Sequence, residues 1–306
     1  LQLVRDADVL VENFKTGTMD RLGIGYEHLR EINPRLIYCS VTGYGSTGPY
    51  SHLPGYDYAV QALGGLMSLN GEPDGEPMKV GVALVDVIAS LYSTVAILAA
   101  LRAREESGVG QRIDVSLLES QVTALFNVAS NYLISGQLPK RYGNGHPNVV
   151  PYQAFQTKDR SLVVAVGNDR QYQRFCKLIG RPELAEDPRF VTNKGRLLNR
   201  DALIPLIQEA LLERTADEWL AILGAEEVPC APINTVDRVF ADPQVQALGM
   251  VMEMDHPTAG SVKLVRSALN LSETPVEYRR HPPLLGEHNA EILARLGYGQ
   301  EDIDSL

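Results

Sequence analysis

Apolar and polar positions in the first part of the chain follow the pattern of alternating strands and helices. Residues 6–14 and 34–43 are short runs of β-branched and aromatic residues that end at Asn, Gly or Pro, as strands do. Residues 18–32 between them have a helical pattern, so these segments predict a βαβ unit. We further expect a helix over residues 86–106, and a strand that continues into a second long helix over residues 111–136.

The composition changes at residues 140–155, which are rich in Gly, Pro and Asn and predict a loop or linker. After it, the pattern predicts a strand at 160–168, a helix at 169–180 and helices within 203–224. Together these elements indicate a smaller α/β unit that ends near residues 227–240.

The C-terminal part has the pattern of a β-rich return, with short strands and turns in residues 249–272 and a helix at 286–297. The fold class that the sequence predicts is therefore α/β, with a large Rossmann-like domain, a small α/β domain that includes the Gly-rich linker, and a C-terminal return to the large domain. Their predicted ranges are 1–140, 141–232 and 233–306.

Charge and cysteine content narrow the function classes. The net charge of −10, with no Lys/Arg cluster, disfavours a nucleic-acid partner, because phosphate backbones are bound by basic surfaces. The cysteines are odd in number and far apart, without CxxC spacing, which argues against a disulfide framework and against a zinc or other metal site. We expect a reducing compartment, the cytoplasm, or the mitochondrion if the source is eukaryotic.

An ionisable residue, Asp86, lies within the apolar run 80–101, which is almost long enough to span a membrane. A carboxylate there would cost about 2.5–3.5 kcal/mol on insertion, and Ser90, Ser93 and Thr94 weaken that interpretation further. We therefore expect no membrane span.

Two other interpretations of Asp86 are compatible with each other. Aspartate is favoured at the start of a helix, where its carboxylate satisfies free N–H groups and the positive end of the dipole for about 1 kcal/mol. A carboxylate at a helix N-terminus beside the carboxyl ends of strands also lies where open α/β sheets bind ligands. Asp86 can thus be a cap, a reactive group, or both.

Several catalytic motifs are absent or unsupported. Residues 43–48 match GxGxxG, but Pro49 and Pro54 follow where a dinucleotide site needs a helix, and no acidic residue stands at the required distance. No GxSxG motif occurs, and His146 in the Gly-rich linker is expected to be a loop residue.

The chain resembles the class III CoA-transferases, the family of formyl-CoA transferase and carnitine CoA-transferase. The resemblance covers essentially the whole chain in the same order, and its most specific segments are 8–50, 55–77, 81–87 and 282–293. Residues 143–159, 187–201 and 239–260 look most like the branch of succinyl-CoA:glutarate CoA-transferases.

This resemblance implies a CoA-transferase fold whose two chains interlock as a homodimer, and it implies that the chain begins after the family's first βαβ unit. Acyl-CoA and a small carboxylic acid are the implied substrates, with no tightly bound cofactor and no metal. The resemblance also implies roles for individual residues: Asp86 as the catalytic nucleophile, Asn13, Phe14, Arg21, Tyr56 and Leu117 at the substrate and CoA, and Gly143 and Gly145 in a possible lid.

In the implied reaction, a carboxylate attacks an acyl-CoA thioester to give a mixed anhydride and then an enzyme-bound CoA thioester. An Asp, with a reference pKa of about 3.9, is already an anion at neutral pH and needs no base to activate it. Racemisation needs a base matched to the operating pH, and Tyr56, where related racemases have a histidine, has a reference pKa of about 10. The residues therefore favour a transferase.

Some alternatives remain open at this level. The chain can be an acyl-CoA racemase or isomerase, or an inactive CoA-binding fragment that lacks part of its site. Tyr56 can line the site or pack in a turn, and Arg21 and Lys15 can meet CoA phosphates or solvent. Arg141, near the linker, is a candidate cation for a dicarboxylate acceptor such as glutarate.

Overall fold

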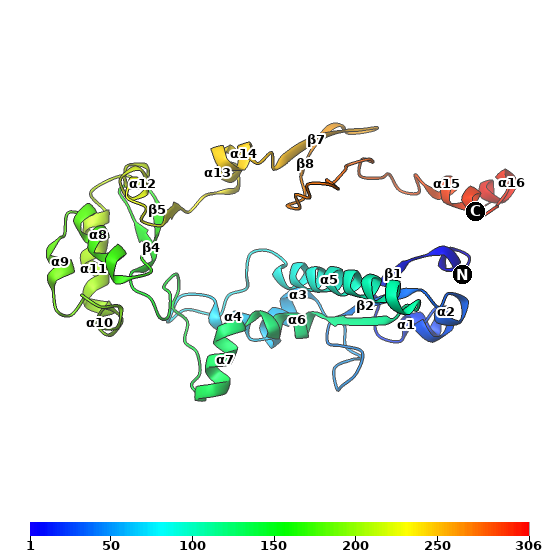
Figure 1. Cartoon of the computed structure of the whole chain (residues 1–306), viewed down its shortest axis with the longest axis horizontal. Coiled ribbons are helices and arrows are strands. Elements are labelled where there is room, and N and C mark those ends of the chain that lie inside the picture. The colour runs from blue at the N-terminus through cyan, green and yellow to red at the C-terminus, as the bar shows by residue number, and fades with distance from the viewer. Residues whose placement is uncertain (306) are drawn as a thin grey trace. The chain divides into compact units, whose positions relative to one another are not determined.

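The computed structural model describes residues 1–305 and divides into two compact units, Leu1–Asn144 and a second that begins at Gly145. Both contain helices and strands, as the predicted α/β class requires (Figure 1). Residues 233–305 belong to the second unit, and their predicted return to the first stays a prediction.

The first unit is built on a parallel sheet in the order β1-β2-β3. Its strands are β1 (Val9–Glu12), β2 (Ile37–Thr42) and β3 (Arg112–Ser116). The pairing of β1 with β2 is parallel, which confirms the predicted βαβ unit. All three strands therefore end at one edge, where Glu12, Thr42 and Ser116 lie.

Helix α5 (Leu84–Ser107) connects β2 to β3 and contacts both strands, which confirms the predicted helix over 86–106. Arg104, in its last turn, donates to Asp8 and to the carbonyl of Arg35, just before β1 and β2 begin. The helix runs antiparallel to the strands, and its N-terminus lies beside their carboxyl ends, because Val85 shares a core cluster with Tyr44. The other helical elements of this unit are η1 (Leu3–Asp6), α1 (Thr18–Arg21), α2 (Tyr26–Ile32), α3 (Asp57–Leu63), α4 (Leu66–Leu69), α6 (Leu117–Ala124) and α7 (Phe126–Ser135).

Two predicted helices are interrupted. The helical pattern over 18–32 forms α1 and α2, because Gly23 adopts φ +71°, a conformation that ends a helix. The long helix expected after β3 breaks between α6 and α7, where Phe126 has φ +48°. The segment 43–48 is followed by turns rather than a helix until α3 begins, so it lacks the structure of a dinucleotide site.

The second unit has an antiparallel sheet, β4-β5-β6, that packs with helices around one core. Phe155, Leu162, Tyr172, Phe175 and Trp219 are among its buried residues. The strands are β4 (Tyr152–Gln156), β5 (Ser161–Ala165) and β6 (Cys230–Pro232), and the helices are α8 (Asp169–Leu178), α9 (Glu183–Glu186), α10 (Asn193–Leu198), α11 (Arg200–Leu211) and α12 (Ala216–Ala225). The predicted strand at 160–168 and helix at 169–180 are confirmed by β5 and α8.

The remainder of the second unit contains the hairpin β7-β8, as the short strands predicted in 249–272 require. Its elements are α13 (Val236–Ala241), α14 (Pro243–Ala247), β7 (Val251–His256), β8 (Gly260–Val265), α15 (Asn289–Arg295) and α16 (Gln300–Asp304).

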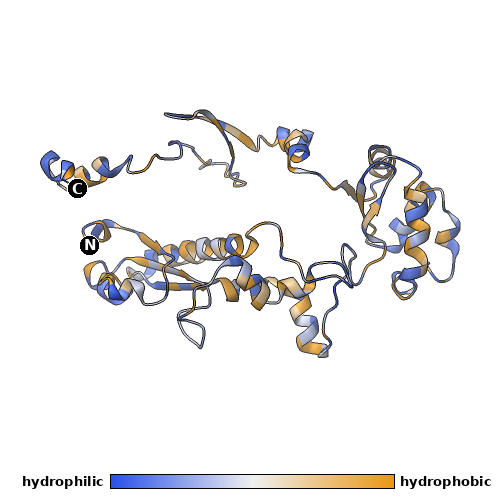
Figure 2. Cartoon of the chain, turned by 180° about the vertical axis from the view of Figure 1, so that it is seen from behind, coloured by the Kyte–Doolittle hydropathy of each residue, from blue (hydrophilic) through white to orange (hydrophobic). Residues whose placement is uncertain are grey.

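Within residues 1–305, α5 is the one helix whose length and composition would allow it to cross a membrane. The hydropathy colours of Figure 2 show the apolar character of α5 and of the strands beside it. A single such helix is weak evidence for a span. Only 22% of the apolar window of α5 is buried, and the helix contacts β2, β3, α3 and α6.

Candidate active site

Asp86 is the third residue of α5 and lies in its first turn, where a negative charge is favoured. It is not the cap. The N-cap position is Ala83, which has no side-chain hydrogen bond to offer, so the capping bond considered for Asp86 is not made. Asp86 lies beside the carboxyl ends of the strands, and its role as a reactive group stays a prediction.

The capping carboxylate comes instead from Asp57, at the start of α3. Its Oδ2 accepts a hydrogen bond from the Val85 N–H of α5 at 2.8 Å, and its Oδ1 accepts one from Gln61 Nε2 at 2.6 Å. The Oε1 atom of Gln61 in turn accepts from the Val80 N–H at 2.9 Å. The segment that leads into Asp86 is therefore held at both of its ends by α3.

The Asp86 carboxylate has no hydrogen-bond partner among residues 1–305, and the side chain reaches solvent. Partial burial and the negative charge of Asp57 both raise the pKa of the Asp86 carboxyl above its ordinary value. A carboxylate that is free of hydrogen bonds and more basic than usual is a better nucleophile than one engaged as a cap.

Contacts along the same sheet edge place other predicted residues at the carboxyl ends of the strands. Asn13, just after β1, donates to the Val41 carbonyl of β2 at 2.6 Å. Gly43, just after β2, accepts from the Leu118 N–H at 3.0 Å. Asn13 and the start of α6, which includes Leu117, are thereby placed at the carboxyl edge.

Tyr56 reaches this edge through a close approach of two glycines, Gly43 and Gly55. A Cβ on Gly43 would lie 2.4 Å from the Cα of Gly55, so neither position accepts a side chain without a shift. Tyr56 follows Gly55 directly and precedes the capping residue Asp57. Its side chain is 76% exposed, which excludes a ring packed inside a turn.

The glycine contact yields a prediction for stability. Gly43→Ala is expected to lower the free energy of unfolding by about 1–3 kcal/mol, because the new methyl group meets backbone atoms that have no room to move. Amide hydrogen exchange in β2, compared with the parent, measures the effect. Gly81→Ala is the control, because a Cβ there meets nothing within 4 Å, and equal protection in the two variants would contradict the prediction.

The positions of the remaining CoA-binding candidates relative to Asp86 are not fixed by a direct contact. Phe14 is 54% exposed, whereas Leu117 is only 6% exposed and belongs to the core cluster that includes Val85. Arg21 lies on α1, where its Nη2 donates to Thr18 Oγ1 at 2.8 Å. No contact within residues 1–305 joins Arg21 to Asp86, so its role, like those of Phe14 and Leu117, stays a prediction.

Arg21 lies beside a polar cleft of about 380 Å³ over the sheet, because its backbone N–H donates to the carbonyl of the lining residue Gly17 at 3.1 Å. Two of its lining acids are engaged, Glu12 with the Ser40 hydroxyl and the Phe14 N–H, and Asp114 with Arg112. The cleft residues are Glu12, Lys15, Thr16, Gly17, Met19, Asp20, Tyr26, Tyr38, Ser40, Ser46, Thr47, Arg112 and Asp114.

The candidate lid glycines lie on either side of the division between the units, Gly143 in the first and Gly145 in the second. Gly143 adopts φ +55°, and a Cβ there would lie 3.0 Å from the Glu72 carboxylate. Arg141 donates to the carbonyls of Glu72 and Gly75 at 3.1 and 2.6 Å. Its guanidinium thus holds a neighbouring loop.

His146 behaves as the loop residue that the sequence predicts. Its Nδ1 accepts from the Asn148 N–H at 3.1 Å, and its ring lies 5.1 Å from that of Tyr152. In the part of the chain that the structure describes, no group of three or more His, Cys, Asp or Glu side chains could hold a metal ion.

Comparison with known proteins places this geometry in a family. The family model described as CoA-transferase family III matches residues 1–289. Succinate–glutarate CoA-transferase of Agrobacterium fabrum is 46% identical over 295 residues, covering 96% of this chain and 74% of that protein. Human succinyl-CoA:glutarate CoA-transferase is 43% identical over 306 residues, covering 100% of this chain and 70% of that protein.

A solved structure supports the same assignment. The crystal structure of a CAIB/BAIF family protein from Brucella suis matches with a TM-score of 0.85 and 47% identity, over 96% of this chain and 77% of that chain. The predicted α/β fold of the CoA-transferases and the resemblance to their family are thus confirmed. The chain belongs to CoA-transferase family III and is an enzyme of that family.

Proposed function

We propose that this enzyme moves CoA from succinyl-CoA to a small dicarboxylate such as glutarate, with Asp86 as the nucleophile. The observation that supports this most directly is the free carboxylate of Asp86 in the first turn of α5, where Asp57 makes the capping bond in its place. The succinate and glutarate specificity rests on the names of the relatives at 43–46% identity.

The proposed reaction balances without a further reagent. The Asp86 carboxylate attacks the succinyl carbonyl, the C–S bond breaks, and a mixed anhydride and CoA thiolate form. The thiolate then attacks the aspartyl carbonyl and releases succinate, which leaves CoA on Asp86 as a thioester. Glutarate repeats these steps in reverse, so that glutaryl-CoA leaves and the carboxylate of Asp86 is restored.

The raised pKa of Asp86 has a consequence for this chemistry. The attacking form is the anion, so activity falls as the pH drops through the pKa of the carboxyl. Because burial and Asp57 raise that pKa, the acid limb of the rate profile lies at a higher pH than an ordinary aspartate would give.

The cleft over the sheet is lined by two cations, Lys15 and Arg112, and by the acids Glu12, Asp20 and Asp114. Lys15 lines it, and the Arg21 guanidinium lies beside Gly17, another lining residue, so both can contribute positive charge to a phosphate. We place the phosphates there and the thioester end at the strand edge, with Asn13, Phe14, Tyr56 and Leu117 along the path between them. Tyr56, being exposed, is free to donate a hydrogen bond to the acyl group.

The test is an exchange assay with succinyl-CoA and glutarate, in which glutaryl-CoA is followed by mass spectrometry. Production of glutaryl-CoA together with free succinate is the expected result. Oxalate and mesaconate replace glutarate in parallel reactions, because relatives at 40% and 36% identity are named for those acids. Failure of every acceptor would contradict the proposal.

Two further measurements, deuterium uptake and CoA binding, separate the two alternatives that the sequence leaves open. A racemase or isomerase would exchange the α-hydrogen of an acyl-CoA for deuterium from the solvent without any acceptor acid. An inactive fragment would bind CoA without exchange. Tyr56 stands at the position where the related racemases have a histidine, so we expect no deuterium uptake.

The interlocked homodimer, the lid formed by Gly143 and Gly145, and the location in a reducing compartment are part of this proposal. Gly143 in the linker has a left-handed backbone conformation, which glycine adopts more readily than other residues. Cys39, Cys176 and Cys230 are free thiols, as a reducing compartment requires. The mass of the particle in solution would test the dimer.

A further inference from the structure

We propose that Asp57 is a positioning residue for the transfer reaction: its hydrogen bonds hold the first turn of α5 so that the Asp86 carboxylate stays free and aimed at the substrate. This inference rests on the proposed function, since it assumes that Asp86 is the nucleophile. The supporting geometry is a chain of three hydrogen bonds, which runs from the Val85 N–H through Asp57 and Gln61 to the Val80 N–H.

The first bond joins Asp57 to the peptide N–H of Val85, the residue immediately before Asp86, at 2.8 Å. It fixes the backbone from which the nucleophile projects. The other two run through Gln61, which receives the Val80 N–H on one atom and donates to Asp57 with the other. Residues 80–85 are therefore tied to α3 at their start and at their end.

These bonds are shielded from water on one side. Gln61 and Val85 are both 0% exposed, and hydrogen bonds in such surroundings are stronger than those made in solvent. Val85 also packs with Val60 of α3 and Ala89 of α5 in one cluster. Packing and hydrogen bonds thus fix the same joint between the two helices.

The arrangement differs from an ordinary helix cap. A usual N-cap is the residue that precedes the helix, and its side chain accepts from the second or third N–H. Here that position is Ala83, and the carboxylate comes from a different helix. Asp86, in the first turn, also carries a carboxylate that could cap the helix. A capping bond made by Asp86 would engage the proposed nucleophile.

The charge of Asp57 supports the same role. It is the one charged side chain that raises the pKa of Asp86. Asp57 therefore adds to the effect of partial burial in making the nucleophile more basic, and a more basic carboxylate attacks a thioester faster.

The decisive experiment compares Asp57→Asn with the double variant Asp57→Asn, Gln61→Glu. Val85 N–H and Gln61 Nε2 both donate to the carboxylate of Asp57. An asparagine has only one oxygen to accept these two bonds, and its amide nitrogen would face the other donor. With Glu at position 61, the carboxylate accepts from the asparagine amide and from the Val80 N–H, and all three bonds form again. Comparing the two variants therefore separates the effect of the hydrogen bonds from the effect of the negative charge at position 57.

We expect Asp57→Asn to lower kcat roughly 10- to 100-fold, because a displacement near 1 Å at the reacting group costs this much, with little change in KM for the acyl-CoA. The double variant should recover most of the lost kcat. In both, the acid limb of the kcat profile should move to lower pH, since the charge beside Asp86 is removed or moved away. Asp74→Asn, in an exposed loop, is the control and should match the parent.

The outcomes are distinguishable. If Asp86→Asn exchanges CoA as fast as the parent, the proposed function is wrong and this inference falls with it. If Asp86→Asn is inactive but Asp57→Asn keeps the parent's kcat and acid limb, only this inference is overturned. The same holds if the double variant melts like the parent but recovers no activity, because restored hydrogen bonds would then have no effect on the reaction.

Discussion

Asp86→Asn is expected to lower the rate of CoA exchange by at least about 10⁴-fold, the loss typical of removing a covalent nucleophile. The amide keeps the size and polarity of the side chain but cannot form the anhydride. Binding of CoA should change little, because the proposed phosphate contacts lie with Lys15 and Arg21. Exchange assays and CoA titration on the same preparations measure the two properties separately.

An isotope experiment makes this prediction specific for the atom that reacts. When glutarate attacks the aspartyl thioester, the bridging oxygen of the anhydride comes from glutarate and stays on Asp86 after glutaryl-CoA leaves. Turnover with ¹⁸O-labelled glutarate should therefore place heavy oxygen in the peptide that contains Asp86. Peptide mass spectrometry reads this directly.

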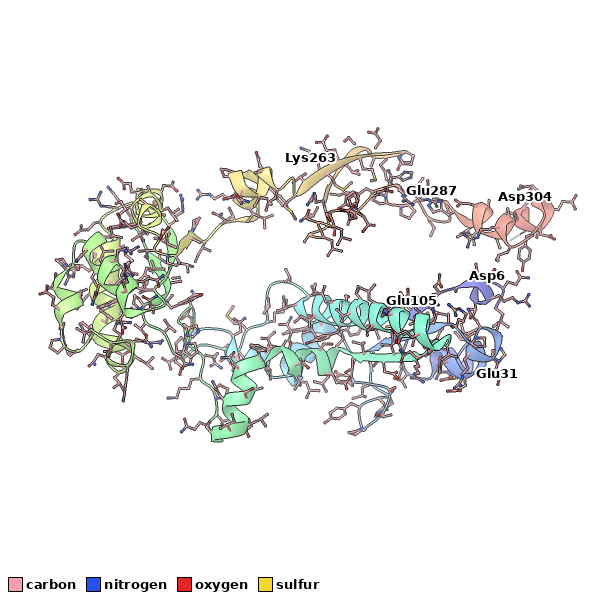
Figure 3. The ribbon with its side chains drawn as sticks, in the orientation of Figure 1. Asp6, Glu31, Glu105, Lys263, Glu287 and Asp304 are labelled. Atoms are coloured by element: carbon pink, nitrogen blue, oxygen red, sulfur yellow. The ribbon has the colours of Figure 1, made fainter. Side chains whose placement is uncertain are left out.

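The control for Asp86 is a carboxylate at the other end of the same helix. Glu105, labelled in Figure 3, pairs with Arg102 at 2.7 Å in an exposed position. Glu105→Gln makes the same change of charge and should exchange CoA at close to the parent's rate. Label in another carboxylate, with none in Asp86, would assign the nucleophile to that other residue.

Sequence patterns predicted the parts of this site that depend on local order. The apolar runs before Asn13 and Gly43 indicated strands, and the apolar run around Asp86 indicated a helix, because each needs only neighbouring residues to be recognised. The breaks at Gly23 and Phe126 were not predicted, since a single left-handed residue leaves the hydrophobic period on either side almost unchanged.

The role of Asp57 could not be predicted for a different reason. Its partner is the backbone N–H of Val85, and a backbone group carries no sequence signal. The two residues are 28 positions apart, and α3 meets α5 through the packing of Val60 with Val85 and Ala89. An acidic residue at the start of a helix is expected to interact with the end of its own helix, so Asp57 alone does not indicate a bond to α5.

Arg196 shows the same limit in the second unit. Arg196 lies among charged and polar residues in the sequence, yet its side chain is 0% exposed. Its Nε donates to the Val150 carbonyl at 2.6 Å, Nη1 to the Phe190 carbonyl at 3.0 Å, and Nη2 to Asp169 at 2.8 Å. Its guanidinium carbon also lies 4.3 Å from the ring centre of Tyr172. One side chain thus joins the start of β4, the loop before α10 and the start of α8.

Arg196→Ala is therefore expected to destabilise the second unit by about 3–5 kcal/mol, the usual cost of removing one partner from a buried charged network. Two buried carbonyls lose their donor, and a cavity replaces the side chain that packs on Tyr172. Trp219 is the only tryptophan in the chain and is 2% exposed in the same core. Urea unfolding followed by tryptophan fluorescence therefore reports on this unit alone.

Arg189→Ala is the matched control, because the Arg189 side chain is 56% exposed and an ion pair made by an exposed side chain contributes about 1 kcal/mol or less. A midpoint for Arg196→Ala close to that of Arg189→Ala would mean that water or a neighbouring donor replaces the guanidinium. Because no residue of the proposed nucleophile's network lies in this core, Arg196→Ala tests the scaffold of the second unit independently of the chemistry at Asp86.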